Sequence, residues 1–527
     1  MIALDGHTLD ISVLWAISKG QQKVELSPNA IKRMEKSRDL VDKLAGQERA
    51  IYGINTGFGP LSGARVSDDD LKQHQINLLH HLSVGQGELF SLEETRSIMA
   101  ARANALARGF SGISPKVVQL LLDCINHNIL PEIPMEGSIG ASGDLVPLAH
   151  MARMLIGLGS VRTSDGRKTA VEAFKEAGLE PIELKCKEGI ALVNGTSAMT
   201  GIAGLDTYAA GKILSWMEFL CSGLFQVMSG EPEVLCEQAH HARGHRGQNM
   251  VAGRIADFLK SNPEYKKEIN DHLWGSHSKP VEWGIEIQDP YSLRCVPQIL
   301  GAFQDSYWHV EMVLNRELNA STDNPLVFAE TESVIHNGNF YGQHTAMVSD
   351  YLRMGLIKMA VLSERQLDRL VNWRYSQGLP PMLSGAREGL NSGMMGCQLL
   401  ATSIVADARL LGMPGSIQSI SSNANNQDVV SMGMSSAKLT RAVIPKCWTL
   451  LAIEALALCQ AAEFRKDEQI FKSTFGGLYE RVREVSPTLV EDRPLYEDIE
   501  AVVKLLKSEQ VQNECFPERP QGPLEIK

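Results

Sequence analysis

The residues of this sequence best suited to chemistry are Ala141, Ser142 and Gly143, because this tripeptide can convert its own backbone into an electrophile. Attack of the Gly143 nitrogen on the Ala141 carbonyl, with loss of two waters, would give a five-membered imidazolone in which Ser142 becomes an exocyclic methylidene. Gly143 has no Cβ to block this tight closure, and Ser142 supplies the hydroxyl that is lost. Read alone, the tripeptide also suits a loop before a helix, with Asp144 as the N-cap of a helix over Leu145–Leu155.

Five further motifs accompany this tripeptide. They are Tyr52–Gly59 (YGINTGFG), Leu192–Ser197 (LVNGTS), Tyr291–Arg294 (YSLR), Thr322–Pro325 (TDNP) and Asn426–Val429 (NQDV). The set resembles the aromatic amino acid ammonia-lyase family, which contains histidine, phenylalanine and tyrosine ammonia-lyases and related aminomutases, and is most similar to bacterial tyrosine ammonia-lyases. The resemblance implies that Ala141–Gly143 forms a 4-methylidene-imidazol-5-one autocatalytically, with no external cofactor.

The elements that must position these residues are mostly helices. Apolar residues at i, i+3 and i+4 predict long helices over 202–228, 298–319, 343–374 and 439–464. The resemblance implies a mainly α fold of the fumarase/aspartase-like superfamily, with a long central helical bundle shared in a homotetramer. We expect a smaller mixed N-terminal region carrying the electrophile (1–195), the central bundle (196–475), and a C-terminal helical segment with a Pro-rich, disordered tail (476–527).

A base must remove the substrate β-proton, and the resemblance implies that Tyr52 does so. An isolated tyrosine here would be interpreted as a ring packed at a turn. A free phenol has a pKa near ~10, so positive charge or donated hydrogen bonds must lower this pKa for the base to act near neutrality. Gly53, Gly57 and Gly59 predict a flexible loop that could close over substrate.

The resemblance also assigns the remaining site residues. Arg294 is expected to bind the substrate carboxylate through two parallel hydrogen bonds, although an isolated arginine is more often a surface residue. Asn194 and Gln427 resemble amides that hydrogen-bond the imidazolone oxygen and the substrate, where negative charge develops. The expected catalytic residues are Tyr52, Ala141, Ser142, Gly143, Asn194 and Tyr291. The expected substrate-binding residues are Gly59, His81, Leu82, Arg294, Asn324, Phe340, Met395, Asn423, Asn426 and Gln427.

The prediction of which amino acid is the substrate depends on the pair His81-Leu82. In the family, phenylalanine lyases tend to hold Phe-Leu there, histidine lyases Ser-His, and tyrosine lyases His-Leu. An imidazole can hydrogen-bond a phenolic hydroxyl, and a site that satisfies this hydroxyl discriminates against an analogue lacking it. Histidine lyases typically hold Gln-Glu where this chain has Asn426-Gln427, so the carboxylate that would face an imidazole substrate is replaced by an amide. Read alone, His81 is a structural histidine.

Composition argues against several other classes of protein. The net charge of −11 and the lack of a basic stripe interleaved with aromatic residues argue against nucleic acid or an anionic membrane as partner. The nine cysteines contain no CxxC and the N-terminus lacks a secretory signal, which predicts a cytoplasmic protein. The apolar stretch Cys447–Phe464 contains Glu454 and predicts a helix buried in a bundle. No further ligand completes the cluster His240, His241 and His245, so we expect no metal site.

Together these patterns predict a tyrosine ammonia-lyase that converts L-tyrosine to p-coumarate and ammonia. The alternatives within the family are a tyrosine 2,3-aminomutase, which re-adds ammonia at the β-carbon, and a histidine or phenylalanine ammonia-lyase. The sequence does not rank lyase against aminomutase. A non-catalytic oligomeric scaffold would be expected to have lost Tyr52, Ser142, Asn194 or Arg294, and all four are present.

Overall fold

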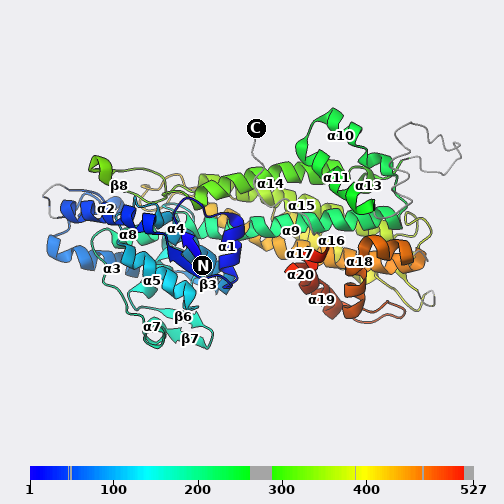
Figure 1. The fold of residues 1–527 in the computed structure, drawn as a ribbon, viewed down its shortest axis with the longest axis horizontal. Helices are drawn as coiled ribbons and strands as arrows, with labels where there is room; N and C mark the ends of the chain where they lie inside the picture. Colours follow the sequence, from blue (N-terminus) through cyan, green and yellow to red (C-terminus); the bar gives the residue numbers. More distant parts are fainter. Residues whose placement is uncertain are drawn as a thin grey trace. The chain divides into compact units, whose positions relative to one another are not determined.

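The computed structural model describes residues 1–45, 47, 50–260, 288–385, 387, 389–465 and 468–515, and these are mainly helical, as predicted (Figure 1). The chain divides into two compact units. Unit 1 comprises Met1–Tyr208, Val310–Tyr351 and Pro414–Arg441, and unit 2 comprises Ala209–His309, Leu352–Met413 and Ala442–Lys527. The division into 1–195, 196–475 and 476–527 stays a prediction, and the expected disordered tail from Phe516 lies outside the described residues.

Four long helices occur where the apolar periodicity predicts them. They are α9 (Ser197–Val227), α14 (Val296–Leu318), α15 (Gln343–Val371) and α17 (Gly433–Arg465). Their ends differ from the predicted ends by a few residues, because the apolar pattern marks the buried face of a helix and not its caps. Each of the four contributes residues to both units.

Unit 1 contains every strand of the described residues and eight complete helices. The strands form small sheets in the orders β1-β2, β3-β5, β4-β6-β7 and β8-β9, of which only the first is parallel. The strands are β1 (Ile2–Leu4), β2 (Val24–Leu26), β3 (Gln86–Leu89), β4 (Leu130–Pro131), β5 (Pro134–Glu136), β6 (Ser160–Thr163), β7 (Gly166–Thr169), β8 (Leu326–Phe328) and β9 (Ser333–Ile335). The helices are α1 (Ile11–Ser18), α2 (Pro28–Ala45), α3 (Leu71–Leu82), α4 (Leu92–Ala107), α5 (Pro115–Asn126), α6 (Leu145–Leu155), α7 (Ala170–Ala177) and α8 (Glu188–Val193).

Helix α4 lies in the core of unit 1 and illustrates how the sequence sets these elements. Its N-terminus carries a capping box, in which the Ser91 hydroxyl accepts from the Glu94 N–H and the Glu94 carboxylate accepts from the Ser91 N–H. Every residue from Ser97 to Ala107 is buried, and many of them are alanines that let neighbouring helices approach closely. Helix α4 therefore packs against α1 and α5 and carries polar residues such as Arg102 into the core.

All regular secondary structure among the described residues of unit 2 is helical. Besides parts of the four long helices, it contains α10 (Glu237–Arg243), α11 (Arg246–Leu259), α13 (Tyr291–Arg294), α16 (Met395–Leu410), α18 (Glu468–Val485), α19 (Tyr496–Lys507) and α20 (Glu509–Cys515). Trp216 is fully buried in α9, and its indole N–H donates to the carbonyl of Leu506 at 2.8 Å. This bond satisfies the one polar atom of a large apolar side chain.

Helix α17 is long and apolar enough to cross a membrane by length and composition, with a mean hydropathy of 1.7 over its most apolar window. However, 78% of the residues in that window are buried inside the protein. The same helix holds Glu454, which is 0% exposed and accepts a hydrogen bond from the Ser363 hydroxyl of α15. These observations confirm the prediction of a core helix.

Burial raises the pKa of Glu454 to about 8, so the side chain is protonated at neutral pH. A carboxyl whose pKa is higher in the folded than in the unfolded state stabilises the fold below its unfolded pKa, and this stability is lost as pH rises toward the folded pKa. We therefore expect Glu454→Gln to gain stability over the wild type between about pH 4.5 and about pH 8, by up to about 1.4 kcal/mol per pH unit.

The measurement is the melting temperature of both proteins across this pH range, with the exposed Glu480→Gln as the matched control. A difference in melting temperature between wild type and Glu454→Gln that does not vary with pH would contradict the prediction.

Candidate active site

The tripeptide Ala141–Gly143 lies in unit 1, in the loop between β5 and α6. Gly140 and Gly143 have left-handed φ angles of 68° and 67°. A Cβ on Gly143 would lie 2.2 Å from the Gly195 carbonyl oxygen, so residue 143 must be glycine for the two backbones to meet. The structure thus brings the tripeptide against the Leu192–Ser197 motif, although about fifty residues separate them in the chain.

The Asn194 side chain is directed at Ser142. Its Nδ2 atom lies 2.8 Å from both the carbonyl oxygen and the Oγ of Ser142, and its Oδ1 accepts from the backbone N–H of Asn324 at 2.7 Å. Because a backbone N–H can only donate, Oδ1 must face Asn324 and Nδ2 must face Ser142. Asn194 therefore presents an N–H donor to the residue that would carry the electrophilic carbon.

Asn324 is half-buried and supports Asn194 through its backbone. Its side-chain Oδ1 accepts from the backbone N–H of Asn337 at 2.8 Å, and Asn337 Oδ1 accepts from the N–H of Asn339 at 2.7 Å. This chain of amides links the tripeptide to the segment that carries Phe340, which is half-buried. The predicted substrate contacts of Asn324 and Phe340 stay predictions.

Asp144 occupies the N-cap position of α6, but its carboxylate does not cap that helix. Instead it accepts from the Met199 N–H at 2.7 Å, in the first turn of α9, and from the Ser138 hydroxyl at 2.8 Å. The alternative interpretation, in which Asp144 caps α6, is wrong because the carboxylate is bonded to Met199 and Ser138 instead. Burial raises the pKa of Asp144 to about 6, and the donated hydrogen bonds oppose part of that rise.

Three buried ionisable residues near the tripeptide were missed by sequence reasoning. Lys187 and Asp323 form an ion pair at 3.0 Å with side chains 0% and 1% exposed. Arg102 is 1% exposed and hydrogen-bonds the carbonyl oxygens of Ala191 and Asn194. Asp323 lies in the Thr322–Pro325 motif, which was the one available signal, whereas lone basic residues in a sequence carry no sign of burial.

Tyr52 is half-buried, with its ring edge-on to Phe58 and His336 at centroid distances of 6.3 and 5.9 Å. Burial raises the pKa of the Tyr52 phenol, and the hydrogen bond from the Gly59 backbone opposes only part of this effect. The expectation of surroundings that lower this pKa is therefore not met by the described residues of one chain, because desolvation outweighs the single donated hydrogen bond. Tyr52 is protonated at neutral pH in this structure.

The Tyr52–Gly59 loop contacts the loop of Asn423–Gln427 in unit 1. A Cβ on Gly59, whose φ is 54°, would lie 2.8 Å from the side-chain nitrogen of Asn423. Asn423, Ala424 and Asn425 all have left-handed φ angles, and Gln427 Oε1 accepts from the Ser422 hydroxyl at 3.0 Å. Oε1 of Gln427 thus has one partner within this loop, and the amide nitrogen carries two N–H donors. Asn426 is exposed on this loop.

His81 and Leu82 form the last turn of α3, where His81 is exposed and Leu82 is half-buried. The Nδ1 atom of His81 lies 3.0 Å from the carbonyl oxygen of Asn77. A carbonyl only accepts, so Nδ1 must carry the hydrogen, and in the neutral ring Nε2 is then an acceptor. His81 can therefore accept a hydrogen bond from a donor such as a phenolic hydroxyl.

The remaining predicted residues lie in unit 2. Tyr291 and Arg294 form the short helix α13, where the guanidinium of Arg294 lies 5.0 Å from the centroid of the Tyr291 ring and its Nε donates to the Asp289 carbonyl at 3.2 Å. Tyr291 is 69% exposed, and Met395 is exposed at the start of α16. Their roles stay predictions.

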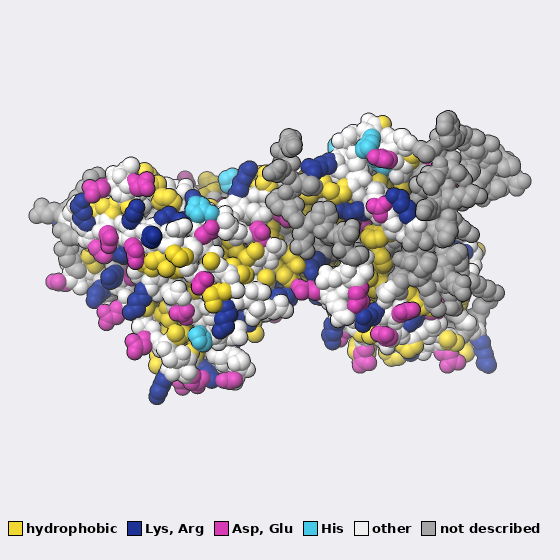
Figure 2. Space-filling model, viewed as in Figure 1, with side chains coloured by type: hydrophobic (Ala, Val, Ile, Leu, Met, Phe, Trp, Pro, Cys, Tyr) yellow, Lys and Arg dark blue, Asp and Glu magenta, His cyan; other side chains and the backbone are white. Residues whose placement is uncertain are grey.

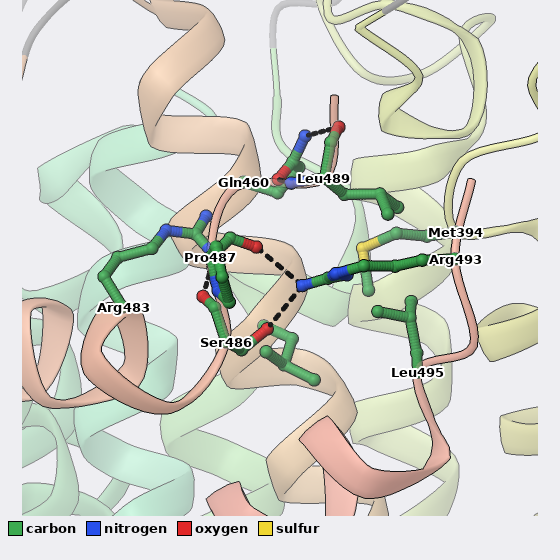
Figure 3. A pocket seen from close by; sticks show the side chains of 9 residues that line it. Met394, Gln460, Arg483, Ser486, Pro487, Leu489, Arg493 and Leu495 are labelled. Carbon is green, nitrogen blue, oxygen red and sulfur yellow. Dashed lines mark hydrogen bonds between the residues drawn. The ribbon is translucent and has the colours of Figure 1, made fainter. Parts of the chain in front are cut away.

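Unit 2 also contains a small pocket that none of the predicted site residues lines (Figure 3). Arg483 and Arg493 bond the backbone carbonyls of Ser486 and Pro487, which fastens this loop to the adjoining helices. The pocket walls comprise Met394, Leu456, Gln460, Arg483, Ser486, Pro487, Leu489, Arg493 and Leu495. The two arginine side chains of this pocket are thus used to hold the loop at Ser486 and Pro487 in place.

Among the described residues, no three His, Cys, Asp or Glu side chains gather to hold a metal ion. In particular, both ring nitrogens of His240 are engaged, with the Val234 carbonyl at 3.0 Å and with Gln248 at 2.8 Å. Figure 2 shows acidic and basic side chains interspersed over the face drawn, with no continuous basic stripe among the described residues there.

Comparisons with known proteins agree on one family for this chain. A family model for aromatic amino acid lyases matches residues 9–484. The chain is 39% identical over 511 residues to the histidine ammonia-lyase of Caldanaerobacter subterraneus, covering 97% of each chain, and 37% identical over 510 residues to that of Stigmatella aurantiaca, again covering 97% of each.

Two solved structures also match over nearly the whole length. The tyrosine aminomutase of Streptomyces globisporus is 36% identical with a TM-score of 0.88, and 96% of each chain is covered. The histidine ammonia-lyase of Trypanosoma cruzi is 33% identical with a TM-score of 0.87, covering 99% of this chain and 96% of that one.

Proposed function

Because this chain belongs to the aromatic amino acid lyase family, we propose that it is an ammonia-lyase that converts L-tyrosine to p-coumarate and ammonia. The observation that carries the chemistry is the orientation of the Asn194 amide, which donates toward both oxygen atoms of Ser142. The observation that carries the substrate is His81, whose Nε2 is left as an acceptor for a phenolic hydroxyl.

The residues present fit a methylidene-imidazolone, since Gly143 closely approaches Gly195 and Asn194 supplies an N–H donor beside Ser142. When formed, this group supplies an electrophile that makes the substrate amine a better leaving group. Asn194 donates a hydrogen bond where negative charge develops, and Arg294 binds the substrate carboxylate. Tyr52, as its phenolate, takes the β-proton, and the C–H electron pair forms the double bond as the C–N bond breaks and ammonia leaves.

Histidine is the second candidate substrate, because the curated relatives named above are histidine ammonia-lyases. Against it stands Gln427, whose amide replaces a carboxylate and whose oxygen is already bonded to Ser422. A tyrosine aminomutase is the third candidate, because the solved tyrosine aminomutase of Streptomyces globisporus is 36% identical to this chain and matches its fold with a TM-score of 0.88. Aminomutase and lyase share the elimination step, so only the fate of ammonia separates them.

The deciding experiment incubates the purified protein separately with L-tyrosine, L-phenylalanine and L-histidine and identifies the products by chromatography and ultraviolet spectrum. Dominant p-coumarate supports the proposal. Urocanate from histidine would overturn the substrate assignment and leave the family chemistry in place. β-Tyrosine would assign the protein to the aminomutases, and no product from any of the three would contradict the proposed reaction.

Replacing His81 with phenylalanine is expected to shift preference from tyrosine toward phenylalanine. A phenyl ring packs against the substrate ring but leaves the tyrosine hydroxyl without its acceptor, which costs about 1–3 kcal/mol. We therefore expect the ratio of kcat/KM for tyrosine to that for phenylalanine to fall by about tenfold or more. The exposed His80→Phe, one position earlier, is the matched control. Unchanged selectivity in His81→Phe would show that this residue does not contact the substrate ring.

We also propose a homotetramer in the cytoplasm, with each active site drawing residues from more than one copy. Large apolar side chains are exposed on unit 2, including Met354 of α15, Leu399 and Leu410 of α16, and Met413. Leu410 is 82% exposed, and contact with another copy would remove such apolar side chains from water. The molar mass in solution, measured by light scattering, tests this: a monomer would contradict it.

A further inference from the structure

The guanidinium of Arg102 joins α4 to the last turn of α8, directly behind the Asn194 amide. We propose that Arg102 is a positioning residue, which holds the Asn194 carboxamide toward Ser142 by bonding the backbone of the turn that carries it. This inference rests on the proposed function, because it names the residue that keeps Asn194 oriented for that reaction. Among the described residues, the hydrogen bonds of Arg102 go to Ala191, Asn194 and Ser197 and not to the ring-forming tripeptide.

Arg102 bonds two carbonyl groups of this turn and the first residue of α9. Its Nη2 donates to the Ala191 carbonyl and to the Asn194 carbonyl, the latter at 2.9 Å, and its Nη1 lies 3.5 Å from the Ser197 hydroxyl. Ala191 and Asn194 lie at the C-terminal end of α8, where carbonyl groups lack helical partners. A cation at this end also meets the negative end of the helix dipole. The fork of the guanidinium therefore fixes the backbone of Asn194 from one side.

Gly195 allows Arg102 this close approach. A Cβ on residue 195 would lie 2.2 Å from Nη1 of Arg102 and 2.7 Å from the Thr322 hydroxyl. The Asn194 side chain is fixed from the other side, since its Oδ1 accepts from Asn324. With the backbone bonded to Arg102 and Oδ1 bonded to Asn324, the amide nitrogen has one direction left, toward Ser142.

A buried ion pair between Lys187 and Asp323 fixes the segment that bonds the Asn194 side chain. Asp323 precedes Asn324, and its carboxylate is bonded to Lys187 at 3.0 Å within the core. The segment that donates to Asn194 thereby has an ion pair of its own, and Arg102 acts on Asp323 only through its charge. A substitution of Arg102 that keeps the charge should therefore release only the backbone side, which leaves Asn194 present but displaced. A displacement of about 1 Å in a catalytic group can cost about a hundredfold in rate.

The test is Arg102→Lys, which keeps the positive charge but replaces the forked donors with one ammonium group. The matched control is Arg33→Lys, because Arg33 bonds the carbonyls of Ala107 and Arg108 at the end of α4 in the same manner and away from the site. We expect kcat for L-tyrosine to fall about a hundredfold in Arg102→Lys with KM unchanged, and to remain near wild type in Arg33→Lys.

A double-mutant cycle with Asn194→Ala separates positioning from general stability. If Arg102 acts through Asn194, adding Arg102→Lys to Asn194→Ala should cause no further loss of kcat. If Arg102→Lys does not fold, as judged by circular dichroism, Arg102→Gln, which keeps an amide donor but loses the fork, is expected to give the same non-additive loss. Additive losses, or equal losses in Arg102→Lys and Arg33→Lys, would overturn the inference. A wild-type protein that turns over no aromatic amino acid would instead overturn the proposed function, and the inference with it.

Discussion

Replacing Ser142 with alanine is expected to abolish the near-ultraviolet absorbance of the imidazolone beyond the tyrosine band, and with it the turnover of L-tyrosine. Alanine has no hydroxyl to lose, so the methylidene carbon that would accept the substrate amine cannot form. A loss of about a thousandfold or more, which corresponds to about 4 kcal/mol of barrier, is expected in kcat. The measurements are the difference spectrum of the folded protein and the rate of p-coumarate formation.

Ser431→Ala is the matched control for this variant. The Ser431 hydroxyl donates to the Gly140 carbonyl at 3.0 Å, so its removal perturbs the same loop but leaves the tripeptide intact. This control should retain the absorbance and most of the turnover. Full activity in Ser142→Ala would show that the protein does not use this electrophile, whereas equal losses in both variants would assign the effect to loop disorder.

Replacing Tyr52 with phenylalanine is expected to lower kcat by about 10² to 10⁴, the range typical of a general base. Phenylalanine preserves the edge-on packing against Phe58 and His336, so the loop should keep its place. The near-ultraviolet absorbance should be unchanged, because Tyr52 is not part of the tripeptide. Loss of the absorbance together with activity would instead place Tyr52 in ring formation.

The pH dependence gives the control for this assignment. Burial raises the pKa of Tyr52 above its usual value near 10, so the phenolate is the minor form at neutral pH. Below that pKa the active fraction grows tenfold per pH unit, and the wild-type kcat/KM should rise from about pH 7 to about pH 9. Tyr52→Phe should lose this rise. A flat wild-type profile would mean that another group removes the proton.

Several features could be predicted because they depend on residues adjacent in the chain. The four long helices follow from apolar spacing, and their positions hold within a few residues. The tripeptide Ala141–Gly143 likewise identifies itself by residue type, since ring closure needs a glycine at 143 and a hydroxyl at 142. The family followed from these motifs in their order along the chain, and the comparison with known proteins confirms it.

Other features depend on contacts between residues far apart in the chain, and no local pattern contains them. Asp144 illustrates this: a residue before a helix suggests a cap for that helix, but its carboxylate binds the start of α9. The direction of the Tyr52 pKa shift is a second case, because desolvation depends on what folds around the ring.

The family of the protein could thus be predicted from its motifs, and the expected cyclisation involves only three neighbouring residues. The direction in which the Asn194 side chain points could not be predicted from the sequence. Asn324 bonds the side-chain oxygen of Asn194 and Arg102 bonds its backbone carbonyl, and these two residues lie 130 and 92 positions from Asn194 in the chain. Hydrogen-bond geometry and burial are properties of the folded core, and they emerge only when α4, α8 and the Thr322–Pro325 segment pack together.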